Sequence, residues 1–506
     1  MWPKRFEPLQ GFDAIEPWHL FIEKDQIKGL LPHRVQRCIP TVHCCDFKTT
    51  LFQKQDVRAE HIDFIVCPKD LGCSLHGRFV KFVFVEGGSQ PVKLSCSLQM
   101  GPQNKHKIIN DPVYGFITVR HALCFDLMDH RYVQRLRRIS QLGLSHYVYP
   151  GAVHNRFHHA VGAMHLMQEA LDVLREKGIA ISREEAEAAC AAILLHDIGH
   201  GPFSHALEHS IVRGVHHEDI STLMMSRMNE AFGGRLDLAI RIFNDDYPRR
   251  FLHALVSSQL DMDRLDYLGR DSFYSGVAEG KVGSDRIIKM LNVAEDQIVV
   301  EEKGIYSIEK FIVARRLMYW QVYLHRTVLS AEYMLMLVLR RAKDLASHGV
   351  PLFSTPALSI FLHEALDRAH FLADPDILER FSELDDSDIL CAMKAWQHHE
   401  DRVLSFLSRS IVERRLFRIE LRDAPFAEEE VDRCRRMLTE TWGMSVEETS
   451  KLVHTGQISN QAYAGSGIHI LYKTGEIRDF AQASDHFTPE LLERKVTKHF
   501  LCYPKN

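Results

Sequence analysis

The sequence predicts a mainly α-helical protein in which a helical core is joined to a smaller α+β C-terminal portion. From residue 108 onward, most segments place apolar residues at three- and four-residue spacing, which is typical of amphipathic helices. Strand-like segments are few and lie mostly beyond residue 350. The chain has 506 residues, of which 45% are hydrophobic, so it is long enough for more than one domain and apolar enough to fold.

Residues 1–99 differ from the rest of the chain. Their periodicity is poor, and only residues 79–87 (FVKFVFVEG) have the pattern of a strand. We expect this segment to be an extension, or translation from a start upstream of the natural one at Met100, that contributes little to the core and is dispensable. A small appended domain of unknown role is the alternative. Six cysteines lie here, and because no two of them form a CxxC pair, their spacing disfavours a zinc site.

Residues 100–346 are predicted to form an all-helical domain. The expected helices are 121–142, 157–177, 183–196, 219–231, 235–244, 249–258, 284–292 and 308–346. Within this region the stretch 298–308 (IVVEEKGIYSI) predicts a hairpin centred on Lys303 and Gly304.

Residues 347–506 are predicted to form an α+β region. Helical patterns occupy 357–370, 375–382, 386–396, 399–408 and 427–440. The segments IHILYK and EIRDF are strand-like and are joined by a turn at Thr474 and Gly475. The segment 413–421 (ERRLFRIEL) predicts the entry to a strand with a basic rim.

Charge and apolar patterning limit the partners of the protein. The formal net charge of -5 gives no overall basic field, so nucleic acid binding is not implied. No stretch approaches the roughly 20 apolar residues that a membrane helix needs, and the N-terminus has no apolar core of a secretion signal. With an odd number of cysteines, 11, and no such signal, we expect a cytoplasmic protein with reduced thiols and no membrane partner.

The strongest chemical signal is the segment 192–209, AILLHDIGHGPFSHALEH. His196 and Asp197 end an apolar helical run just before Gly199, so both side chains can reach an ion beyond the helix end. A neutral imidazole with a carboxylate suits Mn, Fe, Zn or Co, and with added water also Mg. The alternative is a capping Asp beside a surface His, which the apolar run disfavours because it would partly bury the pair.

Two further segments carry candidate ligands. In the segment 149–165, His159 is followed by small residues that permit a close approach of another helix. In the segment 257–271, Asp263 and Asp266 lie three apart and therefore share one helix face. Each pattern alone is more often a solvated surface than a metal site.

Six motifs occur together in the order known from one enzyme family. They are NDPVYG (110–115), QRLRRISQLG (134–143), YPGAVHNRFHH (149–159), HDIGHGPFSH (196–205), HHE (216–218) and DMDRLDYLGRD (261–271). On these motifs the chain resembles the HD-domain phosphohydrolase superfamily, and more closely its deoxynucleoside triphosphate triphosphohydrolases. The resemblance covers residues 108–345 strongly and the C-terminal part weakly.

The resemblance implies a divalent metal ion (Mg, Mn, Fe, Zn or Co) with open positions for water and a phosphate oxygen. The implied ligands are His159, His196, Asp197 and Asp263. The implied acid–base group is His200, His205, His217 and Glu218, the last orienting an imidazole. A histidine can protonate a leaving oxygen near neutral pH. Structural packing beneath the metal is the alternative role of these histidines.

The resemblance also implies substrate contacts. Arg156 and Arg264 resemble phosphate ligands, the second standing where a lysine is usual. The implied contacts to the deoxyribose are Gln141, Leu142, Tyr267 and Asp271, with core filling as the alternative for Leu142 and Tyr267. Three positions depart from the family pattern. They are His158 in place of an acidic residue, Gln321 in place of a phosphate-binding Arg, and Leu329 in place of a sugar-stacking Tyr.

A separate set resembles the family's activator-nucleotide site between subunits. Its members are Asn110, Asp129, Gln134 and Arg137. An Asp that accepts from the guanine N1 and N2 donors suits a guanine nucleotide, so we expect a homo-oligomer, a dimer or a tetramer built from dimers. The alternative is that QRLRR is simply a basic amphipathic helix.

The sequence therefore predicts an enzyme with a nucleotide substrate, which hydrolyses deoxynucleoside triphosphates to deoxynucleoside and triphosphate. A phosphohydrolase acting on another nucleotide or phosphoester is the first alternative. The second is a nucleotide-binding regulatory protein without turnover, which the presence of His205 and His217 beside intact ligands disfavours.

Overall fold

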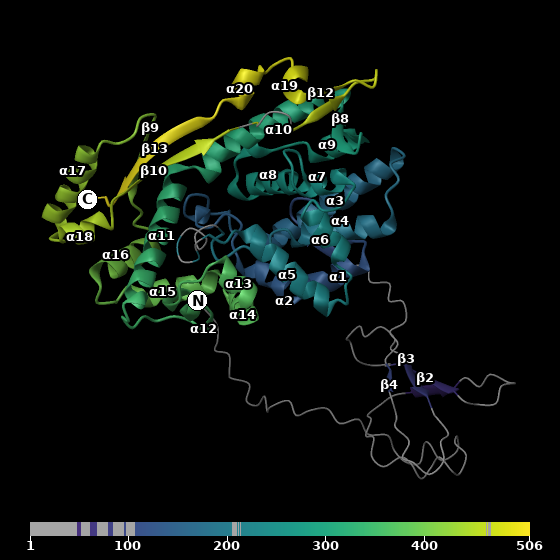
Figure 1. Ribbon diagram of the computed structural model, residues 1–506, viewed down its shortest axis with the longest axis horizontal. Coiled ribbons are helices and arrows are strands. Elements are labelled where there is room, and N and C mark those ends of the chain that lie inside the picture. The colour runs from purple at the N-terminus through teal and green to yellow at the C-terminus, as the bar shows by residue number, and fades with distance from the viewer. Residues whose placement is uncertain are drawn as a thin grey trace, which may run out of the picture. The chain divides into compact units, whose positions relative to one another are not determined.

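The computed structural model describes two compact units, Met1–Lys105 and His106–Asn506 (Figure 1). The described residues are 48–51, 61–67, 79–83, 96–97, 107–204, 210, 212, 214–461, 463 and 467–505.

In the first unit the described residues form a four-stranded antiparallel sheet in the order β1-β2-β3-β4. The strands are Lys48–Leu51 (β1), His61–Cys67 (β2), Phe79–Val83 (β3) and Cys96–Ser97 (β4). The strand predicted within 79–87 is confirmed as β3, whereas the other three lacked a recognisable alternation and were not predicted. The cysteine side chains before residue 100 lie outside the described part of the chain. That residues 1–99 are dispensable stays a prediction.

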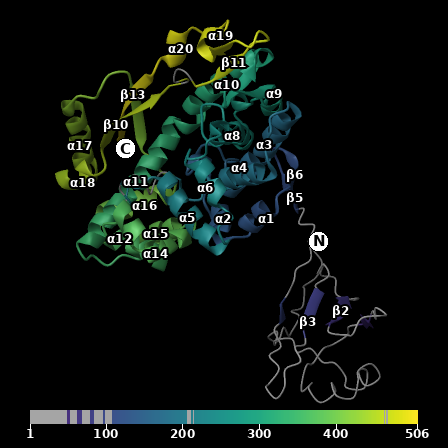
Figure 2. The ribbon, with the colours of Figure 1, turned by 45° about the vertical axis from the view of Figure 1, so that its right-hand side comes forward.

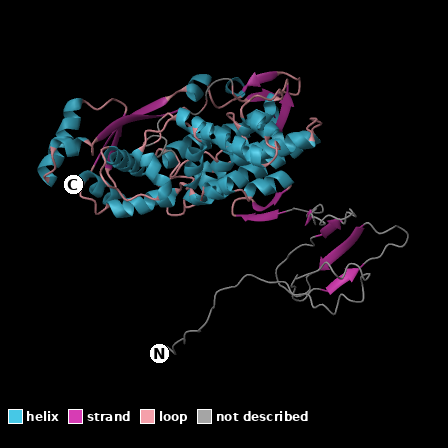
Figure 3. Cartoon of the chain, turned by 60° about the horizontal axis from the view of Figure 1, so that its bottom comes forward, coloured by secondary structure: helices cyan, strands magenta, loops and turns pink. Residues whose placement is uncertain are grey.

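The second unit contains a helical core, which confirms the mainly α prediction (Figure 3). Its helices are Ala122–Met128 (α1), Arg131–Arg135 (α2), Arg156–Glu176 (α3), Arg183–Leu195 (α4), His217–Ala231 (α5), Asp237–Phe243 (α6), Arg250–Val256 (α7), Met262–Ser275 (α8), Ser284–Met290 (α9), Ile305–Met318 (α10) and Arg326–Ser347 (α11). Helix α3 packs against both α4 and α8. The predicted metal ligands lie on these three helices or at their ends.

Two of the predicted long helices are interrupted. The helix predicted over 121–142 breaks after α1, because the His130 side chain accepts a hydrogen bond from Tyr132 N and starts α2. The helix predicted over 308–346 is divided by a π-helical turn, Tyr319–Tyr323, after which His325 caps α11. Such turns occur frequently at functional sites.

The hairpin predicted around Lys303 and Gly304 is wrong. The hairpin lies earlier, where Leu291–Ala294 (β7) pairs with Gln297–Glu301 (β8). Its turn is made by Glu295 and Asp296, whose φ angles of 52° and 59° match the left-handed geometry that tight hairpins need. Residues 302–304 form a short 3-10 turn that leads directly into α10. A second hairpin that was not predicted, Lys107–Asp111 (β5) with Gly115–Val119 (β6), precedes α1.

The C-terminal region combines helices with strands, as predicted. Its helices are Pro356–His363 (α12), Arg368–Ala373 (α13), Pro375–Glu383 (α14), Asp386–Trp396 (α15), Arg402–Val412 (α16), Glu428–Trp442 (α17), Val446–Ser450 (α18), Phe480–Ala483 (α19) and Pro489–Glu493 (α20). Its strands are Arg418–Arg422 (β9), His454–Asn460 (β10), His469–Leu471 (β11), Ile477–Asp479 (β12) and Val496–Tyr503 (β13). The turn at Thr474 and Gly475 is confirmed, and Gly475 has a φ of 87°.

Two sheets connect the parts of the second unit. In one, β10, β13 and β9 pair antiparallel beside α17 and α18 (Figure 1). In the other, the order is β12-β11-β8-β7, so strands from the C-terminal region extend the β7–β8 hairpin; β8 and β12 are labelled in Figure 1 and β11 in Figure 2. One cluster of buried side chains runs from Ile117 to Cys502. The second unit therefore has a shared core across the predicted boundary at residue 346.

Among the described residues, no single helix is long and apolar enough to cross a membrane. One bent pair, Glu302–Tyr323 with Arg326–Ser347, meets the same criterion by length and composition, with a bend of 56°.

Candidate metal centre

Helix α3 carries His159 one turn from its N-terminus. The helix starts firmly because the Asn155 side chain accepts from His158 N while the His158 side chain accepts from Asn155 N. Further along, Gly162 makes the contact with α8 possible: a Cβ there would lie 2.0 Å from Asp266 Oδ1. The small residues after His159 therefore allow the close helix approach that the sequence indicated.

Helix α4 ends at the His-Asp pair. It begins with a capping box between Ser182 and Glu185, and His196 is its C-terminal cap. A Cβ at Gly199 would lie 2.1 Å from His217 O, so only glycine lets the following turn pack on the start of α5. The turn places His196 and Asp197 beside α3.

Helix α8 supplies the third segment. The Asp261 side chain caps this helix by accepting from Arg264 N, which leaves Asp263 in the first turn to face α3. Asp266 follows one turn later on the same face and is fully buried.

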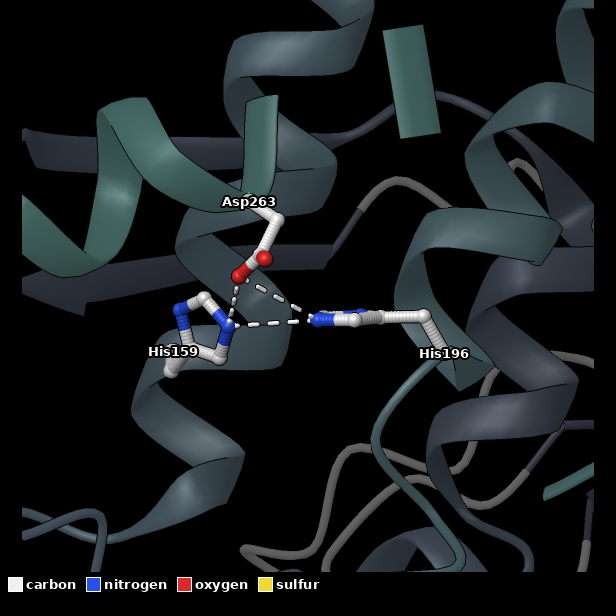
Figure 4. A group of neighbouring side chains, drawn as sticks. All are labelled: His159, His196 and Asp263. Carbon is white, nitrogen blue, oxygen red and sulfur yellow. Dashed lines mark hydrogen bonds and ion pairs between the residues drawn. The ribbon is translucent and has the colours of Figure 1, made fainter. Parts of the chain in front are cut away.

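Three of the four predicted ligands, His159, His196 and Asp263, meet at one point, and Asp197 borders them. His159 Nε2 lies 3.0 Å from Asp263 Oδ1 and 3.3 Å from His196 Nε2, and His196 Nε2 lies 3.4 Å from Asp263 Oδ1 (Figure 4). Asp197 joins them, with Oδ1 3.4 Å from His196 Nε2 and Oδ2 3.7 Å from His159 Nε2. His159, His196 and Asp263 lie close enough together to hold one divalent transition metal ion, whereas Asp197 groups with His200 and His217 beside them.

Each of the two ligand histidines is oriented by a hydrogen bond to the ring nitrogen that points away from the metal position. His159 Nδ1 lies 2.7 Å from Asp266 Oδ2, and His196 Nδ1 lies 2.6 Å from the backbone oxygen of Ile193. Each imidazole can therefore direct its Nε2 lone pair at the shared point, which is how metal-binding histidines are commonly held. Arg270 in turn donates to Asp266 through two of its nitrogens and to Asp111 through a third.

The protein without metal holds protons at this point. Burial alone would lower the pKa of His159, but its hydrogen bonds to Asp263 and Asp266 outweigh burial and raise the pKa to about 10. The pKa of His196 is also raised, since the charges of Asp197 and Asp263 outweigh its burial. Those histidines hold the pKa of Asp263 well below its usual range despite its burial. Metal binding must therefore displace protons.

This displacement predicts that metal binding tightens as pH rises. Between pH 6 and 8, we expect the Kd for Mn²⁺ to fall about tenfold per pH unit for each proton released. For the metal-free protein, by contrast, the stabilisation that these histidines give decreases as pH rises. A raised histidine pKa stabilises the fold fully below the unfolded value of about 6.5, and this stabilisation is lost as pH rises toward the folded pKa. The gap in Tm between Mn²⁺-loaded and EDTA-treated protein should therefore widen with pH.

Calorimetric titration with Mn²⁺ at pH 6, 7 and 8, in two buffers of different ionisation enthalpy, measures both the affinity and the protons released. An affinity that does not change with pH would contradict the proton-holding arrangement.

Two of the predicted acid–base histidines lie next to the centre. His200 Nδ1 is 3.3 Å from Asp197 Oδ1, and the rings of His200 and His217 are 3.9 Å apart. Glu218, in the first turn of α5, is exposed. His205 lies outside the described residues, so its predicted catalytic role stays a prediction.

Arg156 and Arg264 each lie close to a predicted ligand, Arg156 to Asp197 and Arg264 to Asp263. Arg156 ion-pairs with Asp197 and donates to Ser204 Oγ from Nε at 3.2 Å and from Nη2 at 2.8 Å. Arg264 ion-pairs with the buried Asp261, and its Nε is buried without a hydrogen-bond partner among the described residues. Both guanidinium groups are thus fixed beside the ligands.

The predicted sugar contacts fall into two places. Asp271 is buried, with Oδ1 2.8 Å from His154 Nε2 and Oδ2 accepting from the Tyr323 hydroxyl at 2.8 Å. The Tyr267 ring lies 6.1 Å from the ring of Tyr323 and 6.5 Å from the ring of His159. Gln141 and Leu142 are partly buried in the loop before η2, Ser145–Tyr147, a short 3-10 helix.

The structure also brings forward two residues that the sequence comparison missed. Tyr323 contacts Asp271, and Arg315 is close enough to Tyr267 to lower that hydroxyl's pKa against the larger effect of burial. Arg315 Nε and Nη1 are buried without hydrogen-bond partners among the described residues. That Gln321 and Leu329 stand in place of the family's Arg and Tyr stays a prediction. Residue Leu329 lies in the core, and Gln321 Nε2 faces Glu279 Oε1 at 3.4 Å, whereas Arg315 and Tyr323 lie beside Tyr267.

The predicted activator residues lie around α1, α2 and the β5–β6 hairpin. Gln134 Nε2 donates to Met128 O, and Arg137 Nε donates to Gln134 Oε1 at 2.9 Å. Asp129 lies 3.5 Å from Lys107 in an exposed ion pair. Asn110 is on β5, opposite Phe116. The set therefore lies on neighbouring elements, with Gln134 and Arg137 in direct contact.

Family models match two segments of the chain. The HD domain model matches residues 156–271, which include all four predicted ligands, and the HD associated region model matches residues 282–349.

Relatives and solved structures extend this similarity to most of the second unit's length. The "Uncharacterized protein YwfO" of Bacillus subtilis is 32% identical over 423 residues, which is 80% of this chain and 94% of that protein. A Dictyostelium discoideum "Deoxynucleoside triphosphate triphosphohydrolase SAMHD1 homolog" is 30% identical over 53% of this chain and 55% of that protein. A crystal structure of a phosphohydrolase from Bacteroides thetaiotaomicron is 53% identical with a TM-score of 0.77, covering 79% of this chain and all of that one.

Proposed function

This chain belongs to the HD-domain family of metal-dependent phosphohydrolases, and on that premise we propose that it hydrolyses deoxynucleoside triphosphates to deoxynucleoside and triphosphate. The observation that carries the proposal is the group His159, His196 and Asp263, bordered by Asp197, with the guanidinium groups of Arg156 and Arg264 close to it. The printed name of the Dictyostelium relative supports the choice of substrate.

A divalent cation held by His159, His196, Asp197 and Asp263 would supply a Lewis acid for a phosphate oxygen and for water. The chain's own residues bind and orient the triphosphate. Arg156 and Arg264 present donors to the phosphates, and the unpartnered donors of Arg315 lie near enough to Tyr267 to add a third cationic contact. Three guanidinium groups suit a polyphosphate better than a single phosphate ester.

The deoxyribose would lie between Leu142 and Tyr267. The buried Asp271, held by His154 and Tyr323, offers an acceptor for a sugar hydroxyl. An apolar Leu142 at the position of a 2′ hydroxyl would leave that hydroxyl without a partner, so ribonucleotides should be poor substrates.

Cleavage at the α-phosphorus predicts a particular product. If the protein binds the triphosphate while water attacks the α-phosphorus, the leaving group is the 5′ oxygen. Intact triphosphate and a nucleoside should therefore be released. His205→Ala should lower kcat about a thousandfold while leaving KM within a few-fold, as expected for a proton donor in the transition state.

Chromatography of products from each dNTP with Mn²⁺ or Mg²⁺ separates triphosphate from orthophosphate. Orthophosphate release, or no turnover of any dNTP beside rapid cleavage of another phosphoester, would move the assignment to a phosphohydrolase of different specificity. Tight dNTP binding without any turnover would instead favour the regulatory protein without catalysis.

We also propose that a guanine nucleotide binds at Asn110, Asp129, Gln134 and Arg137 and favours a homo-oligomer. The contact between Gln134 and Arg137, with Asp129 on the adjoining end of α1, supports this role because a nucleotide bound there would meet all three at once.

A further inference from the structure

Asp386 is the first residue of α15, yet its carboxylate does not cap that helix. The cap is made by the Asp385 side chain, which accepts from Ser387 N, together with Asp388, which accepts from Asp385 N at 2.7 Å. Asp386 reaches away from the helix: its Oδ2 accepts from Ser140 N at 2.8 Å and its Oδ1 from Phe203 N at 2.7 Å. One carboxylate thus joins two loops that are about 60 residues apart in sequence.

Both loops belong to the metal centre. Ser140 precedes Gln141 and Leu142, and Phe203 follows the turn that carries His200. Phe203 and Ser204 have φ angles of 49° and 61°, in the left-handed region that non-glycine residues rarely adopt. Such a backbone persists only when its surroundings hold it. The hydrogen bond from Phe203 N to Asp386 is one of the contacts that do so.

The loop that contains Phe203 and Ser204 holds Arg156, the proposed phosphate-binding residue, in place. Ser204 Oγ contacts the backbone oxygen of Ser140 at 3.0 Å and accepts from Arg156 Nε and Nη2. Arg156 also ion-pairs with the ligand Asp197. Direct contacts therefore run from Asp386 through Phe203 and Ser204 to Arg156.

A second, independent contact ties the same segments together. Arg135 on α2 is fully buried and donates to Leu384 O at 2.8 Å, just before α15, and to His200 O at 2.8 Å. The start of α15 is thus fastened to the metal-site loop from two directions.

We propose that Asp386 is a positioning residue for phosphate binding at this centre: it anchors the loops 139–143 and 199–204 and thereby fixes Ser204 and Arg156. The inference rests on the proposed phosphate-binding role of Arg156. It separates Asp386 from Asp388, whose carboxylate accepts from Asp385 N within the cap of α15.

Asp386→Asn tests the proposal, with Asp388→Asn as the matched control on the same helical turn. The asparagine oxygen can still accept one amide hydrogen, but its NH2 group opposes the other. In hydrogen–deuterium exchange of the full chain, Asp386→Asn should speed exchange of peptides covering 139–143 and 198–204 by about tenfold, because one of two anchoring bonds is lost. Asp388→Asn should leave both peptides unchanged.

Binding supplies the functional readout without needing turnover. With Mn²⁺ present, Asp386→Asn should weaken binding of inorganic triphosphate by about tenfold while the Kd for Mn²⁺ stays within about threefold, since the ligands His159, His196 and Asp263 sit on helices or their ends. The weaker binding of triphosphate should also appear in dNTP hydrolysis, as a raised KM. Ser204→Ala should reproduce the weaker triphosphate binding without exposing Phe203 N.

Three results would overturn the proposal. They are unchanged exchange in Asp386→Asn, equal effects of Asp386→Asn and Asp388→Asn, or faster exchange with unchanged triphosphate binding. If Asp386→Asn does not fold, the wild-type protein still decides: the amides of Ser140 and Phe203 must be protected like core helix amides although both lie in loops, and rapid exchange there would refute the anchor. A wild type that binds triphosphate but hydrolyses no dNTP would refute the proposed substrate and leave the anchoring result intact.

Discussion

Asp263→Asn should abolish metal-dependent hydrolysis while leaving the protein folded. Asp263 Oδ1 lies 3.0 Å from His159 Nε2 and 3.4 Å from His196 Nε2, so its carboxylate is close to both ligand nitrogens. An amide keeps the shape but removes the charge that a divalent cation needs. Loss of several kcal/mol of transition-state stabilisation corresponds to a decrease in kcat/KM of about a thousandfold or more.

The matched control is Asp285→Asn. Asp263 and Asp285 each lie in the first turn of a helix, so both changes remove a similar interaction with the helix dipole. Asp285 is exposed on α9 and should leave the rate and the Mn²⁺ affinity unchanged. Calorimetry with Mn²⁺, followed by a hydrolysis assay at saturating metal, separates loss of metal from loss of chemistry. Full activity of Asp263→Asn with normal Mn²⁺ binding would remove Asp263 from the site.

The metal centre could be predicted from the sequence because its signals are local. His159, the His196–Asp197 pair and Asp263 each lie at a helix start or end that the sequence marks with glycine, small residues or an acidic cap. The bounds of α3 and α4 were predicted within one residue, and α15 was predicted to its first and last residue, 386–396, but α8 was not among the expected helices. Motif order then supplied the association of three distant segments.

The contacts that hold this centre in place could not be predicted in the same way. Asp386 and Phe203 are 183 residues apart, and Arg135 and Leu384 are 249 apart, so no periodicity joins them. Arg315 was missed for a related reason. A π-helical turn separates it from α11, so its place beside Tyr267 depends on a tertiary contact that the sequence pattern does not mark. Positioning by tertiary contact leaves little trace in one sequence.

The misplaced hairpin has a different cause. Lys303-Gly304 is a common turn signal, but Gly304 is needed for packing, since a Cβ there would lie 2.5 Å from Val300 Cγ1. The true turn uses Glu295 and Asp296, which adopt left-handed φ without glycine. Gly304 is therefore required for close packing, whereas the sequence analysis interpreted it as a turn residue.

The buried network behind His159 should contribute strongly to the stability of the second unit. Arg270 is fully buried and donates to Asp266 from Nε at 3.0 Å and Nη2 at 2.9 Å, and to Asp111 from Nη1 at 2.8 Å. Because two buried carboxylates depend on this one guanidinium, its removal leaves negative charge without a partner. The pKa of Asp266, which burial alone would raise, is held low chiefly by Arg270.

Arg270→Ala should therefore lower the free energy of unfolding by about 3 to 5 kcal/mol, as for other broken buried ion pairs. Arg227→Ala, which breaks an exposed pair with Glu230, should change it by less than about 1 kcal/mol. Arg270→Lys keeps the charge but cannot span both carboxylates with a planar fork, so its stability should fall between those of Arg270→Ala and wild type.

Since Asp266 also orients His159, Arg270→Lys should weaken Mn²⁺ binding about 10- to 100-fold. Thermal unfolding with EDTA and with Mn²⁺ measures both effects, and Arg270→Ala with a wild-type Tm in both conditions would show that the network does not stabilise the fold.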